Sequence, residues 1–98
     1  MVRYKAKPER VSENEELVRA VYGELDRTHP DGFHYATFKL IDGVSFIHLA
    51  AHRGADNPLR QIEAFQRFQE GIADRCDELP AVEEVEEIGS YRFTEEQS

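Results

Sequence analysis

The sequence predicts a single α+β domain in which two helices pack on one face of a four-stranded antiparallel sheet. Segments with strand-like alternation and segments with helical spacing follow one another in the order strand, helix, strand, strand, helix, strand. A chain of 98 residues is the size of one domain and can bury roughly two-thirds of the surface of its unfolded form. The core is therefore thin, and a second subunit would help to stabilise it.

The first strand and the first helix are predicted near the N-terminus. Residues 2–6 alternate apolar with basic side chains, as in a strand, and Pro8 ends the run. Ser12 and Glu15 have the spacing of a capping box, so we expect a helix to begin there. This helix ends before the turn sequence at residues 30–32, and it buries a stripe formed by Leu17, Val18, Val21, Tyr22 and Leu25.

The centre of the chain is predicted to form a β-hairpin. Two strand-like runs flank Asp42 and Gly43, a dipeptide typical of a two-residue turn. In such a turn Ile41 lies opposite Val44, and the pairing can be counted outward from there. The count pairs Lys39 with Phe46, Thr37 with His48, Tyr35 with Ala50 and His34 with Ala51.

A second helix and a last strand are predicted after the hairpin. Asn57 is the expected N-cap and Pro58 the first helical residue, where its missing amide proton costs nothing. Pro80 opens the last extended segment, residues 81–93, in which glutamates interrupt the alternation and predict a bulge near Val85. One side of the helix is expected to join the core through Leu59, Ile62, Phe65, Phe68, Ile72 and Cys76.

Two interleaved right-handed crossovers in one sheet give the ferredoxin-like βαββαβ fold, with strand order 4-1-3-2 and both helices on one face. We expect residues 1–93 to form this domain and the polar residues 94–98 to form a flexible tail. Because the first and last strands are neighbours, we expect Arg3 and Lys5 to form ion pairs with the glutamates between positions 83 and 87.

The hairpin register divides its side chains between two faces. A nearly pure apolar face is expected to lie under the helices, and it carries Ala36, Phe38, Leu40, Ile47, Leu49 and Ala51. The other face is too apolar for contact with solvent, and it carries Phe33, Tyr35, Thr37, Lys39, Ile41, Val44, Phe46, His48, Ala50 and His52. Since both helices are already used, we expect a second copy of the chain to cover this face in a homodimer.

Three of the four histidines lie in the hairpin, which raises the question of a metal site. His48 and His52 share a face but are separated by roughly 13 Å along the strand, at about 3.3 Å per residue. Two ligands of one zinc ion must each reach it at about 2 Å, and His34 points to the opposite face. We therefore expect no mononuclear metal site in the hairpin.

His48 is the candidate catalytic base. It is expected to lie opposite Thr37, with Tyr35 and Lys39 as diagonal neighbours, where this set could orient or deprotonate a small ligand held between two sheets. Thr37, Phe46 and Phe33 are the candidate ligand-binding residues. The alternative is a histidine that only forms hydrogen bonds at a dimer interface.

Composition restricts the partners of the protein. Twelve basic and twenty acidic residues give a net charge of −8, which disfavours nucleic acid and anionic membrane surfaces. No apolar run approaches the roughly twenty residues that span a bilayer. The single cysteine, Cys76, allows no internal disulfide, so we expect a soluble, cytoplasmic protein. The sequence also has no glycine-rich phosphate loop, nucleophile elbow or Cys/His dyad.

Five segments within residues 1–93 together suggest a family: MVRYKAKPE, ENEELVRAVYGELDRTHPDG, HYATFKLIDGVSFIHLA, NPLRQIEAFQRFQEGIADRC and GSYRF. In their order and phrasing they resemble the dimeric α+β barrel superfamily, most closely its antibiotic biosynthesis monooxygenase-like and stress-responsive barrel proteins. The resemblance implies a homodimer in which two sheets close a barrel. The haem-degrading branch is excluded, because its pattern needs a tryptophan and this chain has none.

The resemblance implies a cofactor-independent monooxygenase-like enzyme that acts on a small hydrophobic or phenolic substrate, with no metal or flavin. Such an enzyme binds an acidic phenol, stabilises its anion and excludes water, so that the substrate itself passes an electron to oxygen. Two alternatives stay open: a non-catalytic module that binds a small ligand, and a structural dimerisation module whose interior is solid.

Overall fold

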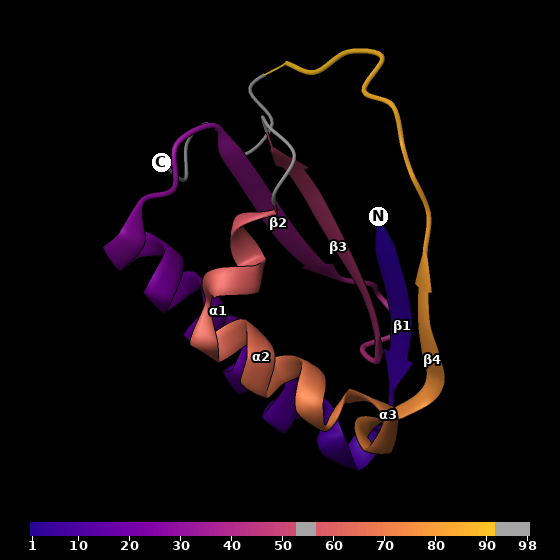
Figure 1. The fold of residues 1–98 in the computed structure, drawn as a ribbon. Coiled ribbons are helices and arrows are strands. Elements are labelled where there is room, and N and C mark those ends of the chain that lie inside the picture. The colour runs from indigo at the N-terminus through magenta and orange to yellow at the C-terminus, as the bar shows by residue number, and fades with distance from the viewer. Residues whose placement is uncertain (53–56, 92–98) are drawn as a thin grey trace.

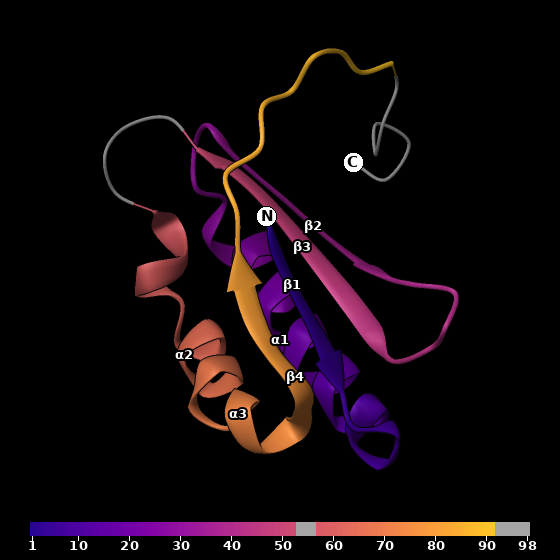
Figure 2. The same ribbon diagram turned by 90° about the vertical axis from the view of Figure 1, so that its right-hand side faces the viewer.

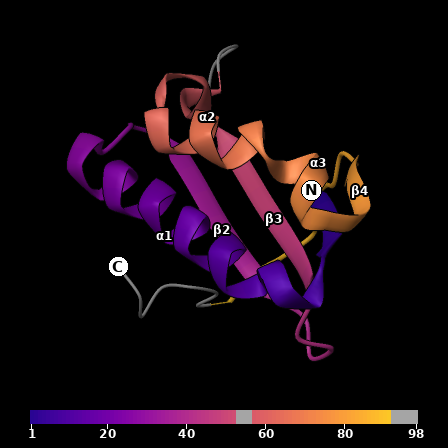
Figure 3. The same cartoon turned by 90° about the horizontal axis from the view of Figure 1, so that it is seen from below.

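The computed structural model describes residues 1–52 and 57–91. Its strands are β1 (Val2–Ala6), β2 (Phe33–Lys39), β3 (Ser45–His52) and β4 (Cys76–Val82), and its helices are α1 (Val11–Thr28), α2 (Glu63–Glu70) and α3 (Ile72–Arg75). Two short 3-10 helices, η1 (Pro8–Arg10) and η2 (Pro58–Gln61), precede α1 and α2. The strands form one antiparallel sheet in the order β2-β3-β1-β4, which is the predicted order 4-1-3-2 read from the other edge. Figures 1 and 3 show α1 and α2 together on one side of this sheet. The α+β class and the antiparallel sheet are therefore confirmed.

The first helix begins earlier than predicted. Pro8 starts the short helix η1, which leads directly into α1 at Val11, so Ser12 lies inside the helix instead of capping it. The predicted capping box is wrong because the fixed backbone angle of Pro8 favours a helical turn four residues before Ser12. The helix ends at Thr28, and its C-cap is His29, whose φ of 46° is left-handed and whose amide donates to the carbonyl of Leu25 at 2.9 Å.

The hairpin has the predicted register but a different tip. Seven residue pairs run from Phe33 opposite His52 to Lys39 opposite Phe46. The Leu40 amide donates to the Ser45 carbonyl at 2.8 Å, so the loop spans residues 41–44 instead of two residues. Asp42 holds this loop, because its carboxylate accepts from the backbone amides of Val44 and Ser45 and from the Ser45 hydroxyl. The register of the other pairs is unchanged, because the longer loop only removes the predicted pair of Ile41 with Val44 at the end of the hairpin.

The two faces of the sheet are the reverse of the prediction. Phe46 and His48 are 2% and 5% exposed and lie beneath the helices, where the His48 ring packs against Phe68 of α2 and Thr37 bonds to Tyr22 of α1. The predicted core face, Ala36, Phe38, Leu40, Ile47, Leu49 and Ala51, points away from the helices. The prediction failed because both faces are apolar enough to be buried, and period-two alternation does not say which face the helices take.

The C-terminal part of the fold also differs from the prediction. The expected second helix is divided into η2, α2 and α3, and the last strand begins at Cys76 instead of after Pro80. Pro80 is tolerated inside β4 because this strand forms an edge of the sheet, next to β1 (Figure 2). Residues 83–91 form neither helix nor strand, and residues 92 and 93 of the predicted strand, like the predicted tail, lie outside the described residues.

The pairing of β1 with β4 determines which residues lie opposite the basic side chains of β1. The irregularity in this pairing lies around Lys5, opposite Glu78, and not near Val85. Lys5 Nζ lies 3.9 Å from the Glu78 carboxylate, and Arg3 lies opposite Ala81. The predicted pairs with the glutamates at positions 83–87 are therefore wrong, because β4 is shifted toward the N-terminus of its predicted position. In the described part of the chain, no helix is long and apolar enough to cross a membrane.

Candidate functional site

A cavity of about 630 Å³ lies between the sheet and the segment formed by η2 and α2. Six strand residues line it: Val2, Tyr35, His48, Ala50, Pro80 and Val82. The helical segments contribute four apolar side chains, Arg60 and two glutamines, and Met1 and Asn57 complete the lining. This volume falls in the range of about 300–1,000 Å³ that is typical of small-ligand sites. His48 and Tyr35 therefore face a cavity within one subunit, and not the space between two sheets that the sequence suggested.

Two helix-capping interactions hold the helical wall of the cavity in place. The Asn57 side chain accepts from the Leu59 amide at 3.0 Å, so Asn57 is an N-cap as predicted, although of the short helix η2. The following helix, α2, is capped from α1: the Glu24 carboxylate accepts from the amides of Glu63 and Ala64 at 3.3 and 3.0 Å. A carboxylate at a helix N-terminus also interacts favourably with the helix dipole. Glu24 thus ties α2 to α1 above the sheet.

His48 lies at the centre of a buried hydrogen-bond network. Its Nδ1 atom is 2.8 Å from the Tyr35 hydroxyl and 3.0 Å from the Thr37 hydroxyl, and its Nε2 atom is 2.8 Å from the Tyr4 hydroxyl. Burial lowers the pKa of His48 from 6.5 to about 4, so the ring is neutral near neutral pH. Burial also raises the pKa of Tyr35 and of Tyr4, which keeps both phenols protonated.

The network continues from Tyr4 away from the cavity. The side-chain amide of Asn14 donates to the Tyr4 hydroxyl at 2.8 Å, and Arg75 Nε donates to the Asn14 oxygen at 3.2 Å. The Arg75 guanidinium also donates to the Phe68 carbonyl at 2.6 Å and lies 5.1 Å from the centre of the Phe68 ring. Among the described residues, every buried side-chain nitrogen and oxygen atom has a hydrogen-bond partner.

Tyr4, Asn14 and Arg75 were not among the predicted site residues. Asn14 precedes Val18 by four residues and Val21 by seven, so it falls on the buried stripe of α1. Arg75 precedes the buried Cys76 and is itself only 1% exposed. A polar residue at a position that the helical period marks as buried was the signal available in the sequence.

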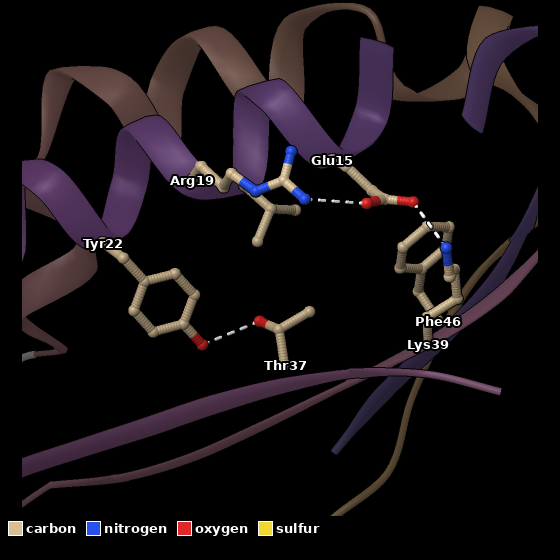
Figure 4. A pocket seen from close by; sticks show the side chains of 7 residues that line it. Glu15, Arg19, Tyr22, Thr37, Lys39 and Phe46 are labelled. Atoms are coloured by element: carbon tan, nitrogen blue, oxygen red, sulfur yellow. Dashed lines mark hydrogen bonds and ion pairs between the residues drawn. The ribbon is translucent and has the colours of Figure 1, made fainter. Parts of the chain in front are cut away.

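Lys39 lies apart from His48. Its side chain is 43% exposed, and its Nζ atom is 2.7 Å from the carboxylate of Glu15, which also pairs with Arg19 at 3.0 Å. These three charged residues border a smaller pocket of about 230 Å³, shown in Figure 4. Lys39 is thus held by an ion pair at the surface, instead of joining His48 as its position on the strand had suggested.

Of the remaining predicted site residues, Thr37 and Phe46 line the smaller pocket, and Phe33 lines neither pocket. Thr37 lines the smaller pocket and also bonds to His48, and its hydroxyl is 2.8 Å from that of Tyr22 (Figure 4). Phe46 lines the smaller pocket and stacks on Tyr4, with ring centres 5.4 Å apart. Phe33 stacks on Tyr35 at 5.7 Å and does not line the larger cavity. The structure therefore brings Tyr35, Thr37 and His48 together and leaves Lys39 and Phe33 outside.

The register of the hairpin places His34 on the face opposite His48, as expected. Within residues 1–52 and 57–91, no group of three or more His, Cys, Asp or Glu side chains is arranged to hold a metal ion. The polar groups that line the cavity are the neutral His48 imidazole, the protonated Tyr35 phenol, the Arg60 guanidinium and the side-chain amides of Asn57, Gln66 and Gln69.

Comparison of the chain with protein-family models, with curated proteins and with solved structures finds no match.

Proposed function

We propose that this protein binds a small hydrophobic molecule carrying a polar oxygen, such as a phenol, in the cavity between the sheet and α2. One observation carries the proposal: a largely apolar cavity of about 630 Å³ contains, on its sheet side, a hydrogen-bonding cluster that includes Tyr35 and His48. Apolar walls supply affinity, and a few fixed polar groups supply orientation.

A matched pair of neighbouring residues tests the binding site. Ala50 lines the cavity, whereas Ala51 lies on the opposite face of β3. Ala50→Phe should fill part of the cavity and weaken the binding of α-naphthol at least about tenfold, since the ring displaces apolar contact area. Ala51→Phe should leave the affinity unchanged. Calorimetric titration of both variants measures the difference, and equal affinities would contradict the site.

The second candidate function is a cofactor-independent oxygenase, as the family resemblance implies. The placement of one neutral phenol, Tyr35, and one neutral imidazole, His48, at a largely apolar cavity supports it, because such a site can hold a substrate anion away from water. The reaction balances without a further reductant: a phenol with an unsubstituted para carbon and one O₂ give a quinone and one water. In this candidate His48 is the base, with Tyr35 beside it.

Oxygen uptake separates the two functions. A panel of phenols and quinols, measured with the wild-type protein and with His48→Ala, should show turnover that the substitution abolishes if the protein is an oxygenase of this kind. Equal turnover in the two proteins, or none in either, removes the oxygenase and leaves the binding function.

We also propose that a second copy of the chain covers the outer face of the sheet in a homodimer of the α+β barrel type. The residues that face away from α1 and α2 include Ile47 and Leu49, which are only partly buried within one subunit. Apolar surface of this kind is stabilised by a partner.

The buried thiol of the lone Cys76 supports a reducing, cytoplasmic location.

Sedimentation tests the dimer. Leu49→Glu should convert a dimer to a monomer at micromolar concentration, because it places a charge in the contact. Gln61→Glu adds the same charge at an exposed position of η2 and should not change the mass. A folded wild-type monomer would contradict the dimer.

A further inference from the structure

The buried network defines which nitrogen of His48 carries the proton, and it begins with Arg75. Arg75 Nε can only donate a hydrogen bond, so the Asn14 side chain must turn its oxygen toward Arg75. The Asn14 nitrogen then faces Tyr4 and donates to its hydroxyl oxygen at 2.8 Å. Asn14 and Arg75 are 0% and 1% exposed, so this orientation is set within the protein.

Tyr4 transmits the orientation to His48. Because the Tyr4 oxygen accepts from Asn14, its own proton points to its other described partner, the Nε2 atom of His48, at 2.8 Å. If Nε2 carried a proton, the buried phenol proton would have no acceptor, which costs about 1–3 kcal/mol. Nε2 is therefore bare.

A neutral imidazole that is bare at Nε2 carries its proton on Nδ1. Nδ1 faces the hydroxyls of Tyr35 and Thr37 at 2.8 and 3.0 Å, so His48 donates toward them. It follows that His48 has no bare nitrogen on the side of the cavity, so this proton arrangement argues against His48 as the base of the second candidate function and favours the binding function.

The hydroxyls of Tyr22, Thr37 and Tyr35 form the end of the network. Thr37 bonds to Tyr22 at 2.8 Å, and the Tyr35 hydroxyl lies 2.8 Å from Nδ1. The contact to Nδ1 already has the proton of His48, so the Tyr35 oxygen accepts there and the Tyr35 proton points out of the cluster. An acceptor in the larger cavity selects the arrangement in which Tyr35 accepts from His48 and donates to the ligand.

We propose that Arg75, acting through Asn14 and Tyr4, sets the Nδ1-protonated form of His48 and thereby makes Tyr35 a hydrogen-bond donor to a ligand oxygen in the cavity. The ligand class is a compact apolar molecule with an acceptor oxygen, such as a ketone or an oxyanion. Arg75, Asn14, Tyr4 and His48 are positioning residues. The ligand part of this proposal rests on the proposed function, whereas the proton arrangement does not.

Nitrogen-15 NMR of the histidine rings tests the proton arrangement without a ligand, because protonated and bare ring nitrogens have well-separated shifts. The wild-type protein should show His48 protonated at Nδ1 and bare at Nε2. Asn14→Asp should reverse the two, since a carboxylate accepts from both Arg75 and Tyr4, and Tyr4 must then accept from Nε2. Gln61→Glu, with the same added charge at an exposed position, should leave the ring as in the wild type.

A wild-type ring protonated at Nε2, or an Asn14→Asp ring that keeps the wild-type form, would overturn the proposal. The wild-type measurement needs no variant, so it decides even if Asn14→Asp does not fold.

The ligand part is tested with acetophenone and ethylbenzene, which differ by one acceptor oxygen. Wild type should bind acetophenone about tenfold more tightly, the ratio that one net hydrogen bond provides, and Tyr35→Phe should remove the advantage. Equal binding of the two probes would overturn the donor role of Tyr35 and leave the cavity as a binding site. Failure of both probes to bind would contradict the proposed function and, with it, the ligand part of the proposal.

Discussion

The pH dependence of stability is the most quantitative consequence of burying His48. Its pKa is about 4 in the folded protein because of burial, compared with an ordinary value of 6.5. Between these values the unfolded chain binds more protons than the folded one, so the stability falls as the pH falls from 6.5 toward 4. Integrating this difference from about pH 7 to about pH 5 gives a loss of about 2 kcal/mol that belongs to His48 alone.

Urea unfolding of three proteins at both pH values measures this loss. His48→Gln keeps hydrogen-bonding groups at the position but cannot titrate, so its stability should fall by about 2 kcal/mol less than that of the wild type. His52→Gln removes an exposed histidine from the same strand and should follow the wild type. Carboxylates with lowered pKa values, such as Glu15, contribute equally to all three proteins. If His48→Gln and the wild type lose the same amount, His48 is not the buried neutral ring described above.

Three further substitutions test individual contacts. Glu24→Ala should cost about 1 kcal/mol in urea unfolding because it uncaps α2, whereas Glu16→Ala, at an exposed position of α1, should cost little; equal effects would contradict the cap. Asp42→Ala should lower the melting temperature more than Asp31→Ala, because Asp42 accepts three hydrogen bonds in the hairpin loop. The pKa of Asp42 is lowered from 3.8 to about 2, mainly by hydrogen bonds from Ser45. The contribution of Asp42 to stability is therefore present above pH 3.8 and is lost as the pH falls through about 2. Arg75→Met should cost about 3 kcal/mol in urea unfolding, because it leaves buried acceptors unpaired, and a cost as small as that of an exposed-site substitution would contradict the network.

Local sequence signals predicted the parts of the fold that depend on short-range geometry. The hairpin register could be counted from Asp42 and Gly43 because pairing is fixed by the turn and by the alternation of each strand. The same alternation does not identify the face that the helices cover, since that depends on contacts such as those of His48 with Phe68, far away in the sequence. The start of β4 was missed because Pro80 was interpreted as a boundary, although an edge strand tolerates it.

The candidate site was predicted only where it lies within the hairpin. Tyr35, Thr37 and His48 share a face of two paired strands, so their proximity follows from the register. Asn14 and Arg75 come from two helices, and their meeting behind His48 depends on how those helices pack. Lys39 was misplaced because a long side chain at the end of a strand reaches the nearest carboxylate, here Glu15 of α1.

The central claim, that the cavity beneath α2 binds a small hydrophobic molecule beside Tyr35 and His48, is tested most directly by NMR shift mapping with α-naphthol. We predict saturable shifts at Tyr35, His48 and Phe68, which surround the cavity, and no comparable shifts at Leu49 on the outer face. Shifts centred on the outer face, or no saturable shift at all, would contradict the claim.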